Sequence, residues 1–444
     1  MSVNETLQFQ LFQFLEDSQY WSPAQMLDHQ QNQIAQLLDH ARKNVPFYEK
    51  RLNPVLHPGG TVDWSRWQDI PILKRSDLLN HRESMLATKM PPGHGVVSDS
   101  EGSGTTGTPA ITRHNGLTHL ASMTAIYRAY DWHKVDYGGV FVQWMGNDPE
   151  VANWPEGLHK GPWGPAWKPR TAKGQFWQIN RATSPENVAE FLKRRNADYI
   201  SSRPLSVQSV ALAAERLGLD ISLKGASVFS TAASQQDRED CRRVFGAEMI
   251  SLYASKEVYN IAHQCTHGEH LHVNSELVLL EVLDDRDRPV PPGTRGRAIV
   301  TSFYNTSQPF IRYDLGDQIV MDDRPCPCGR TLPVIARIEG RTTHLFRFPD
   351  GRKIAPSIPP HFRNLLGAVT WQMAQVEPLA VEVRYQPDGL GKAPDFDAFT
   401  HEVRLRTDPD VAVRYKAIAE LPLTPSGKFI EYVCELPPEQ ESLR

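Results

Sequence analysis

The sequence is poor in the features that mark several large classes of protein. It has only 5 cysteines in 444 residues, which argues against a disulfide-built secreted domain and favours a reducing cytoplasm. No apolar run approaches the roughly 18 residues that a membrane helix needs. The net charge of −4 shows no basic excess of the kind that marks nucleic-acid binding. The first residues lack a basic segment followed by an apolar run, so we expect no signal peptide and no membrane or nucleic-acid partner.

The composition is otherwise that of a globular protein too long for one core. Hydrophobic residues make up 40% of the chain and charged residues 23%. A chain of 444 residues exceeds the size at which a single hydrophobic core stops growing, so we expect at least two domains. Residues 22–45 have helical periodicity, with Ser22 as a cap and Pro23 in the first turn.

Strand-like and helix-like stretches alternate between residues 138 and 260. This alternation predicts a parallel sheet with helices and places the chain in the α/β class. From 272 to 320 the pattern changes to strands joined by turns, with HVNSELVLLEVLD as the first strand. The remainder of the chain returns to short strands and a helix. We place a domain boundary near residue 340, just after IARIEGR.

The stretch EGSGTTGTP at residues 101–109 combines glycines with hydroxyl side chains. Glycine lets successive backbone N–H groups converge on an anion, and Ser and Thr hydroxyls add donors to phosphate oxygens. The stretch lacks the lysine of a GxxxxGK[ST] loop, so it is not of the Walker type. By itself it fits a surface turn as well as a phosphate-binding loop.

Two later motifs carry polar groups suited to a nucleotide. In YNTSQPFIRYDLGD, Asp317 follows a tight glycine turn and could accept two hydroxyls of a ribose. In LPLTPSGKF, Lys428 could donate to a carboxylate or phosphate oxygen. A polar hairpin turn and a solvated loop lysine are the alternatives for each residue taken alone.

Taken in order, several motifs resemble those of adenylate-forming acyl-CoA ligases. They are SGTTGTP, YASKEV, PFIRYDLGD, the Gly-Arg pair at 340–341 and LTPSGK. With LLDHARKNVPFYEKRL near the start, they bring the chain closest to the phenylacetate–CoA ligase branch. The likeness implies a large N-terminal AMP-binding domain over 1–340, of α/β class with parallel and mixed sheets and a β-barrel-like part. It also implies a small mobile α+β lid domain over 341–444.

The reaction of this family, which the resemblance implies here, proceeds through an acyl-adenylate. A carboxylate attacks the α-phosphate of ATP and releases pyrophosphate, so that a poor acylating agent gains AMP as a good leaving group. The thiol of coenzyme A then displaces AMP and gives an acyl-CoA thioester. Bringing two anions together requires cations and donors around the phosphates. The implied ligands are ATP, Mg²⁺, a small carboxylic acid and CoA, and a homodimer is an open alternative to a monomer.

The resemblance also assigns roles to single residues. Glu257 and Lys428 would be the catalytic pair: Glu257 would bind Mg²⁺, and Lys428 would contact the carboxylate and α-phosphate oxygens during adenylation only. The residues that would bind ATP are Ser103, Gly104, Thr105, Thr106 and Gly107 at the β- and γ-phosphates, Tyr253 near the adenine or the acyl group, and Asp317 with Arg341 at the ribose.

The chain departs from the family pattern at several places, which keeps other functions open. Ala254 and Lys256 stand where the family has Gly and a hydroxyl residue, and residues 229–234 lack the family's acidic adenine contact. After Arg341 the hinge reads Thr-Thr-His instead of an acidic pair. Transfer to an amine or to a carrier-protein thiol is therefore an alternative to CoA. A non-catalytic nucleotide-binding protein of the same fold is a further alternative, although the intact acidic and basic motif positions argue against it.

Cysteine and histidine residues gather in two segments and form a candidate zinc site. RPCPCGR holds Cys326 and Cys328, and QCTHGEHLHVNSE holds Cys265, His270 and His272. Thiols from both segments with one imidazole would complete a tetrahedral Zn²⁺ site, although C-x-C alone fits two inert thiols in a turn. The resemblance includes branch members with structural zinc at matching positions. We therefore expect a structural zinc held by Cys265, His272, Cys326 and Cys328, with His270 as the alternative to His272.

Tryptophans are concentrated in one stretch that bears on the acid substrate. The family builds its acyl pocket from this part of the N-terminal domain, so an aromatic acid is our hypothesis, and packing in the core is the alternative for each tryptophan. Nearby, His159, Lys160, Lys168 and Arg170 could pair with a polar substituent on the acid or be solvated. The tryptophans are Trp132, Trp144, Trp154, Trp163, Trp167 and Trp177.

Overall fold

A computed structural model describes most of the chain. The described residues are 3–57, 59–102, 110–146, 148, 150–341, 345–354, 356, 358, 362–388, 393–422 and 429–437. The loop at 103–109, the Thr-Thr-His hinge at 342–344 and Lys428 lie outside them, and only the backbone of Arg341 is described. Among the described residues, no helix has the length and apolar character needed to cross a membrane.

The N-terminal region is helical. Helix α1 (Val3–Ser18), which the sequence did not predict, precedes α2 (Pro23–Asn44). Ser22 caps α2 as predicted: its hydroxyl accepts from the backbone N–H of Gln25, and the Gln25 side chain accepts from the Ser22 N–H at 3.0 Å. The short helical elements that follow are η1 (Pro46–Tyr48), η2 (Trp64–Asp69), α3 (Arg75–His81) and η3 (Glu83–Met85).

A two-stranded hairpin carries the glycine-rich loop. Strands β1 (Ser98–Gly102) and β2 (Ala110–His114) pair antiparallel, with Gly102 opposite Ala110. Gly102 and Ala110, the residues on either side of 103–109, are therefore held next to each other.

One 12-stranded mixed sheet lies at the centre of the larger N-terminal part, in the order β11-β12-β13-β14-β10-β9-β8-β7-β6-β3-β5-β4. Neighbours from β8 to β5 run parallel, as the alternation of strands and helices predicts. This half consists of β3 (Val140–Trp144), β5 (Gln175–Ile179), β6 (Tyr199–Ser202), β7 (Gly225–Phe229) and β8 (Met249–Ser255), with β4 (Leu158–Gly161) antiparallel at the edge and η4 (Thr171–Lys173) before β5.

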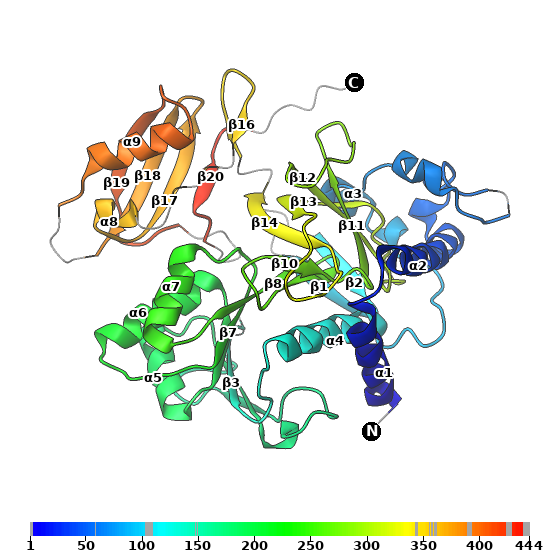
Figure 1. Ribbon diagram of the computed structural model, residues 1–444, viewed down its shortest axis with the longest axis horizontal. Helices are drawn as coiled ribbons and strands as arrows, with labels where there is room; N and C mark the ends of the chain where they lie inside the picture. The colour runs from blue at the N-terminus through cyan, green and yellow to red at the C-terminus, as the bar shows by residue number, and fades with distance from the viewer. Residues whose placement is uncertain are drawn as a thin grey trace.

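Three helices cover the parallel half. α5 (Pro185–Arg195), α6 (Pro204–Arg216) and α7 (Gln235–Phe245) lie together on one side of these strands (Figure 1). They share one hydrophobic core with the strands, in which Phe191 and Phe245 are buried.

The other half of the sheet pairs antiparallel and takes the place of the expected barrel-like part. Helix α4 (Gly116–Trp132) packs on it, and Ala121 and Ala125 enter the same core as the buried residues of these strands. The strands are β9 (Tyr259–Gln264), β10 (Leu271–Val273), β11 (Val278–Leu283), β12 (Arg295–Ser302), β13 (Tyr313–Asp322) and β14 (Val334–Arg341).

The stretch HVNSELVLLEVLD forms two strands, not the single strand that its composition predicts. Between β10 and β11, Asn274 and Glu276 bind the buried guanidinium of Arg128 from α4. Arg128 donates to the two carboxylate oxygens of Glu276 at 2.5 and 3.3 Å and to Asn274 Oδ1 at 3.0 Å. Both charged side chains are 0% exposed. A buried arginine requires such acceptors, and supplying them interrupts the strand.

The chain after Arg341 forms a smaller unit with a four-stranded sheet in the order β19-β18-β17-β20 and a core of its own. Figure 1 shows this unit beside α7, where Arg363 lies 3.8 Å from Asp240 of that helix. A domain boundary near 340 stays a prediction. The elements are β15 (Phe346–Arg347), β16 (Lys353–Ile354), α8 (Arg363–Leu366), β17 (Ala368–Glu377), β18 (Ala380–Pro387), α9 (Phe396–Arg406), β19 (Ala412–Ala417) and β20 (Tyr432–Cys434).

Candidate active site

Two tyrosine–acid pairs join the YASKE segment to β13. Tyr253 on β8 donates its hydroxyl to Asp317 Oδ2 at 2.7 Å. In the opposite direction, Tyr313 at the start of β13 donates to Glu257 Oε1 at 3.1 Å. The fold thus brings Asp317 to the YASKE segment that holds Tyr253 and Glu257, and adds Tyr313 to them.

The backbone around Asp317 explains its position. Gly316 has a φ of +73°, a left-handed conformation that favours glycine, and its N–H donates to Asp314 Oδ1 at 2.8 Å. Asp317 lies opposite Arg341 in the pairing of β13 with β14. The backbone of Arg341 is therefore beside Asp317, as the resemblance implies.

The glycine-rich hairpin is attached to the same segment through Lys256. The carbonyl oxygen of Lys256 accepts from His114 Nε2 at 2.8 Å, and its ammonium lies 3.4 Å from the Ser100 hydroxyl on β1. The unexpected lysine next to Glu257 thus contacts both strands of the hairpin. The predicted phosphate-binding residues Ser103, Gly104, Thr105, Thr106 and Gly107 lie outside the described part of the chain.

Arg75 is a further cation at this site that sequence reasoning missed. Leu73 pairs with the start of β13: its N–H donates to the Arg312 carbonyl at 2.9 Å, and its own carbonyl accepts from Asp314 N–H at 2.9 Å. This bridge brings Arg75, the first residue of α3, to 3.9 Å from Glu257 Oε1. Nothing in the local sequence relates residue 75 to residue 257, because only the tertiary pairing joins them.

Residues 229–234 lie at the carboxyl end of β7, next to β8. Ser230 has a φ of +80°, and Ser234 caps α7 through a reciprocal pair with Asp237. In open α/β sheets, ligands bind outside the carboxyl ends of the strands. The segment therefore borders the same edge as Tyr253 without supplying an acidic side chain.

Glu257 has the chemistry of a magnesium ligand. Its side chain is 13% exposed, and its carboxylate is oriented by the Tyr313 hydroxyl. Mg²⁺ prefers oxygen ligands and is commonly held by one or two carboxylates together with phosphate oxygens. Glu257 therefore has the donor chemistry that a bound Mg²⁺ would require.

The cysteine and histidine segments meet in space. The donor atoms of Cys265, His270, His272 and Cys326 all lie within 4.8 Å of one another. His270 Nε2 is 3.1 Å from Cys326 Sγ, and Cys328 Sγ is 3.2 Å from His272 Nε2. The fold therefore brings all of the predicted zinc residues, and the alternative His270, into one cluster.

The geometry of this cluster fits a tetrahedral metal better than a disulfide. The Sγ atoms of Cys265 and Cys326 are 3.6 Å apart, whereas a disulfide bond measures about 2.0 Å. Two thiolates on one tetrahedral zinc, each about 2.3 Å from it, lie about 3.8 Å apart. His272 Nδ1 lies 3.2 Å from the Leu332 carbonyl and donates to it, which directs the lone pair of Nε2 to the cluster. Burial lowers the pKa of His272 to about 4, so this ring is neutral.

The tryptophan-rich stretch is largely occupied by packing contacts. Trp144 and Trp163 donate to the carbonyls of Asn180 and Gly139 at 3.0 and 2.8 Å. Trp177 stacks on His159, with ring centroids 4.6 Å apart. These contacts favour the alternative of structural packing for the three tryptophans.

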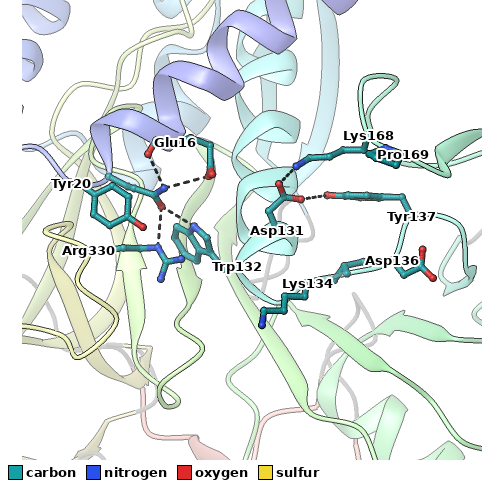
Figure 2. Close-up of a pocket in the computed structure, with 12 residues that line it drawn as sticks. Glu16, Tyr20, Asp131, Trp132, Lys134, Asp136, Tyr137, Lys168, Pro169 and Arg330 are labelled. Carbon is teal, nitrogen blue, oxygen red and sulfur yellow. Dashed lines mark hydrogen bonds and ion pairs between the residues drawn. The ribbon is translucent and has the colours of Figure 1, made fainter.

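A hollow of about 460 Å³ opens between the end of α1, the end of α4 and Arg330 (Figure 2). Figure 2 shows Lys168 and Tyr137 both directed at Asp131. Lys168 is thus paired within the protein, and so is Arg170, 3.0 Å from Asp136. Of the residues assigned to ATP, none that the structure describes lines this hollow.

Comparison with known proteins shows what the chain is similar to. No family model matches the chain. The chain is 24% identical over 340 residues to a phenylacetate–coenzyme A ligase of Thermus thermophilus, a match that covers 70% of this chain and 69% of that enzyme. A 2-hydroxyisobutyryl-CoA ligase in its postadenylation state superposes with a TM-score of 0.72 at 16% identity, covering 94% of this chain and 92% of that one. For the anthranilate CoA ligase AuaEII in complex with anthranoyl-AMP, the TM-score is 0.50 at 14% identity, covering 74% of this chain and 65% of that one.

In its fold and in the order of its motifs, the chain is similar to the adenylate-forming CoA ligases. The sequence relative among them is a phenylacetate–CoA ligase. The enzyme class that these relatives support is an acid–CoA ligase.

Proposed function

We propose that this protein uses ATP to convert a carboxylic acid into an acyl-adenylate and then transfers the acyl group to CoA. The products are an acyl-CoA thioester, AMP and pyrophosphate. The observation that carries the proposal is the reciprocal pairing of Tyr253 with Asp317 and of Tyr313 with Glu257, next to the hairpin that holds the glycine-rich loop.

The nucleoside end of ATP is assigned to the Tyr253–Asp317 pair. A carboxylate can accept hydrogen bonds from both hydroxyls of a ribose, and the 2.7 Å bond from Tyr253 orients that carboxylate. Tyr253 is 8% exposed, so packing holds its ring in place and the ring would form part of the wall of the proposed nucleotide site. We assign Arg341 to the same sugar because its backbone lies opposite Asp317.

The phosphates are assigned to the loop at 103–109, to Glu257 and to Arg75. Mg²⁺ held by Glu257 would bridge phosphate oxygens and neutralise part of their charge. Arg75 lies 3.9 Å from Glu257 and supplies a second positive charge at this site, whereas residues 103–109 contain no lysine. We assign Lys428 to the carboxylate and α-phosphate oxygens, where a cation opposes the repulsion between two anions.

The acid is the least constrained ligand. We propose aromatic acids as the first class to examine, since the sequence relative is a phenylacetate–CoA ligase. Short hydroxy acids come next, because the structural neighbour is a 2-hydroxyisobutyryl-CoA ligase.

Exchange of labelled pyrophosphate into ATP tests the adenylation step over a panel of acids. We expect exchange with at least one acid and its loss in Lys428→Ala. Absence of exchange with every acid contradicts the proposal. Adding CoA to the active acid should then give a thioester, detected by mass spectrometry, whereas a product formed only with an amine or a carrier protein would contradict the CoA step.

We also propose that the cysteine–histidine cluster binds a structural zinc. The support is that the thiols of Cys265, Cys326 and Cys328 converge with two imidazoles. These residues offer more donors than the four that tetrahedral zinc requires. A site with all positions filled by protein has no place for substrate, so its role is to tie β9 and β10 to the loop before β14.

A further inference from the structure

His114 is a buried histidine between the glycine-rich hairpin and the segment that carries Glu257. It is the last residue of β2 and is 1% exposed. Its Nε2 lies 2.8 Å from the Lys256 carbonyl oxygen, and its Nδ1 lies 3.2 Å from the side-chain nitrogen of Asn305. The two ring nitrogens therefore contact two segments that are distant in the sequence.

The contacts of Asn305 determine which ring nitrogen carries the proton. Its amide oxygen accepts from the Ser307 hydroxyl at 2.7 Å and from the Gln308 N–H at 3.3 Å. Its amide nitrogen donates to the Arg113 carbonyl at 2.9 Å. This nitrogen can only donate to His114, so Nδ1 accepts and Nε2–H donates to the carbonyl of Lys256. Burial lowers the pKa of His114 to about 4, so the ring carries a single proton near neutral pH.

The ring is fixed in this orientation by its neighbours. Tyr259 stacks on it with centroids 4.3 Å apart and planes inclined by 28°. The Thr112 hydroxyl lies 3.2 Å from Nε2 and 3.4 Å from the same Lys256 carbonyl. The carbonyl that precedes Glu257 is thus held by a rigid donor on the strand that leaves the glycine-rich loop.

We propose that His114 is a positioning residue for adenylation, which holds Glu257 at a fixed place relative to β2, the strand that follows residues 103–109. The inference rests on the proposed function, because it assigns Glu257 to Mg²⁺. A metal that contacts both the carboxylate and the phosphates at about 2.0–2.1 Å tolerates little displacement of either one. The Lys256 peptide leads directly to Glu257, so loss of its hydrogen bond lets the carboxylate drift away from the loop.

Two substitutions separate the hydrogen bond from simple packing. In His114→Gln, the amide nitrogen reaches the place of Nε2 and keeps a donor for Lys256. In His114→Asn, the shorter amide reaches only the place of Nδ1, so it keeps the contact with Asn305 and leaves the Lys256 carbonyl without the 2.8 Å bond from the imidazole, with only the longer contact to Thr112. We expect the asparagine variant to raise the Mg²⁺ concentration for half-maximal pyrophosphate exchange about tenfold. We expect a change below about threefold for the glutamine variant and an unaltered KM for the acid in both.

Binding of ATP with and without Mg²⁺, followed by calorimetry, provides a test that needs no acid substrate. If the wild-type protein binds Mg²⁺–ATP but none of the acids in the panel supports pyrophosphate exchange, the proposed function is contradicted. The effect of the His114 substitutions can still be compared through ATP binding. Equal Mg²⁺ dependence in wild type and His114→Asn overturns the inference. An equal rise in the required Mg²⁺ concentration in His114→Asn and His114→Gln overturns the inference in favour of a packing role. A rise in the KM for the acid as large as the rise in the Mg²⁺ requirement overturns it in the same way.

Chemical rescue covers the case in which the asparagine variant does not fold. In His114→Ala, imidazole should restore the Mg²⁺ dependence of ATP binding, because it replaces both the ring and the N–H donor. N-methylimidazole fills the same space without an N–H group, and we expect no rescue from it. Equal rescue by the two compounds overturns the inference.

Discussion

Replacing Glu276 by glutamine should lower the unfolding temperature of the N-terminal part strongly, because it leaves the charge of Arg128 uncompensated in the core. Both side chains are 0% exposed. Arg128 also donates to the Leu15 carbonyl at 2.9 Å, and the Ser18 hydroxyl donates to Glu276 at 3.0 Å, so the pair fixes α1 as well. Removing one partner of a buried ion pair costs about 3–5 kcal/mol. Glutamine has almost the shape of glutamate, so the loss is electrostatic and no cavity forms.

The measurement is calorimetric unfolding at a fixed scan rate, since a chain with more than one core is not expected to unfold in a single two-state step. For chains of about 150–250 residues, the unfolding midpoint falls by roughly 2–4 °C for each kcal/mol of stability lost, and longer chains show the smaller shifts. We therefore expect the midpoint to fall by about 6–10 °C. The control is the double variant Arg128→Met/Glu276→Leu, which removes both charges and should recover most of the loss. A midpoint for Glu276→Gln within about 2 °C of wild type refutes the reasoning, as does a double variant no better than the single one.

Three further predictions address the proposed ligands and the pH dependence of stability. Asp317→Asn should raise the KM for ATP at least about tenfold, because a hydrogen bond to a charged group is worth about 1.5–3 kcal/mol; an unchanged KM for ATP contradicts the ribose assignment. The purified protein should contain about one equivalent of zinc, and chelation should lower its unfolding midpoint; metal analysis that finds next to no zinc, with stability unaffected by chelation, contradicts the zinc assignment. Burial, followed by the nearby Asp237 carboxyl, raises the pKa of Glu431 to about 8 from a reference of 4.5. The folded state then holds a proton that the unfolded chain releases, so stability should fall as pH rises from about 4.5 to about 8. Glu431→Gln should flatten that decline. Equal slopes of stability against pH in the wild type and in Glu431→Gln would contradict this prediction.

The parts of the fold that local signals encode could be predicted from the sequence. The Ser22 cap identified the start of α2, and the alternation of strands and helices identified the parallel half of the sheet. The sequence also predicted that the two cysteine–histidine segments form one cluster, but it left the choice between His270 and His272 open. Residues two apart on an extended chain point to the same side, so both imidazoles reach the cluster.

The remaining residues of the site could not be found this way, because their partners come from distant segments. Arg75 reaches Glu257 only through the pairing of Leu73 with β13, and His114 lies 142 positions from its partner Lys256. The break between β10 and β11 has the same origin. An apolar pattern reports which residues are buried, and it cannot report that Asn274 is buried to bind an arginine from α4.

The hairpin that carries the glycine-rich loop also restricts where the chain can gain or lose a residue. Thr112 and His114 face Lys256 together because they are two apart on β2, while Arg113 between them bonds to Asp99 of β1 at 2.7 Å. Deleting one residue within β2 would shift the strand register and exchange its two faces. The arginine would then replace the imidazole beneath Glu257. Insertions and deletions within β1 or β2 are therefore incompatible with an intact site, even where they leave every proposed ligand residue in place.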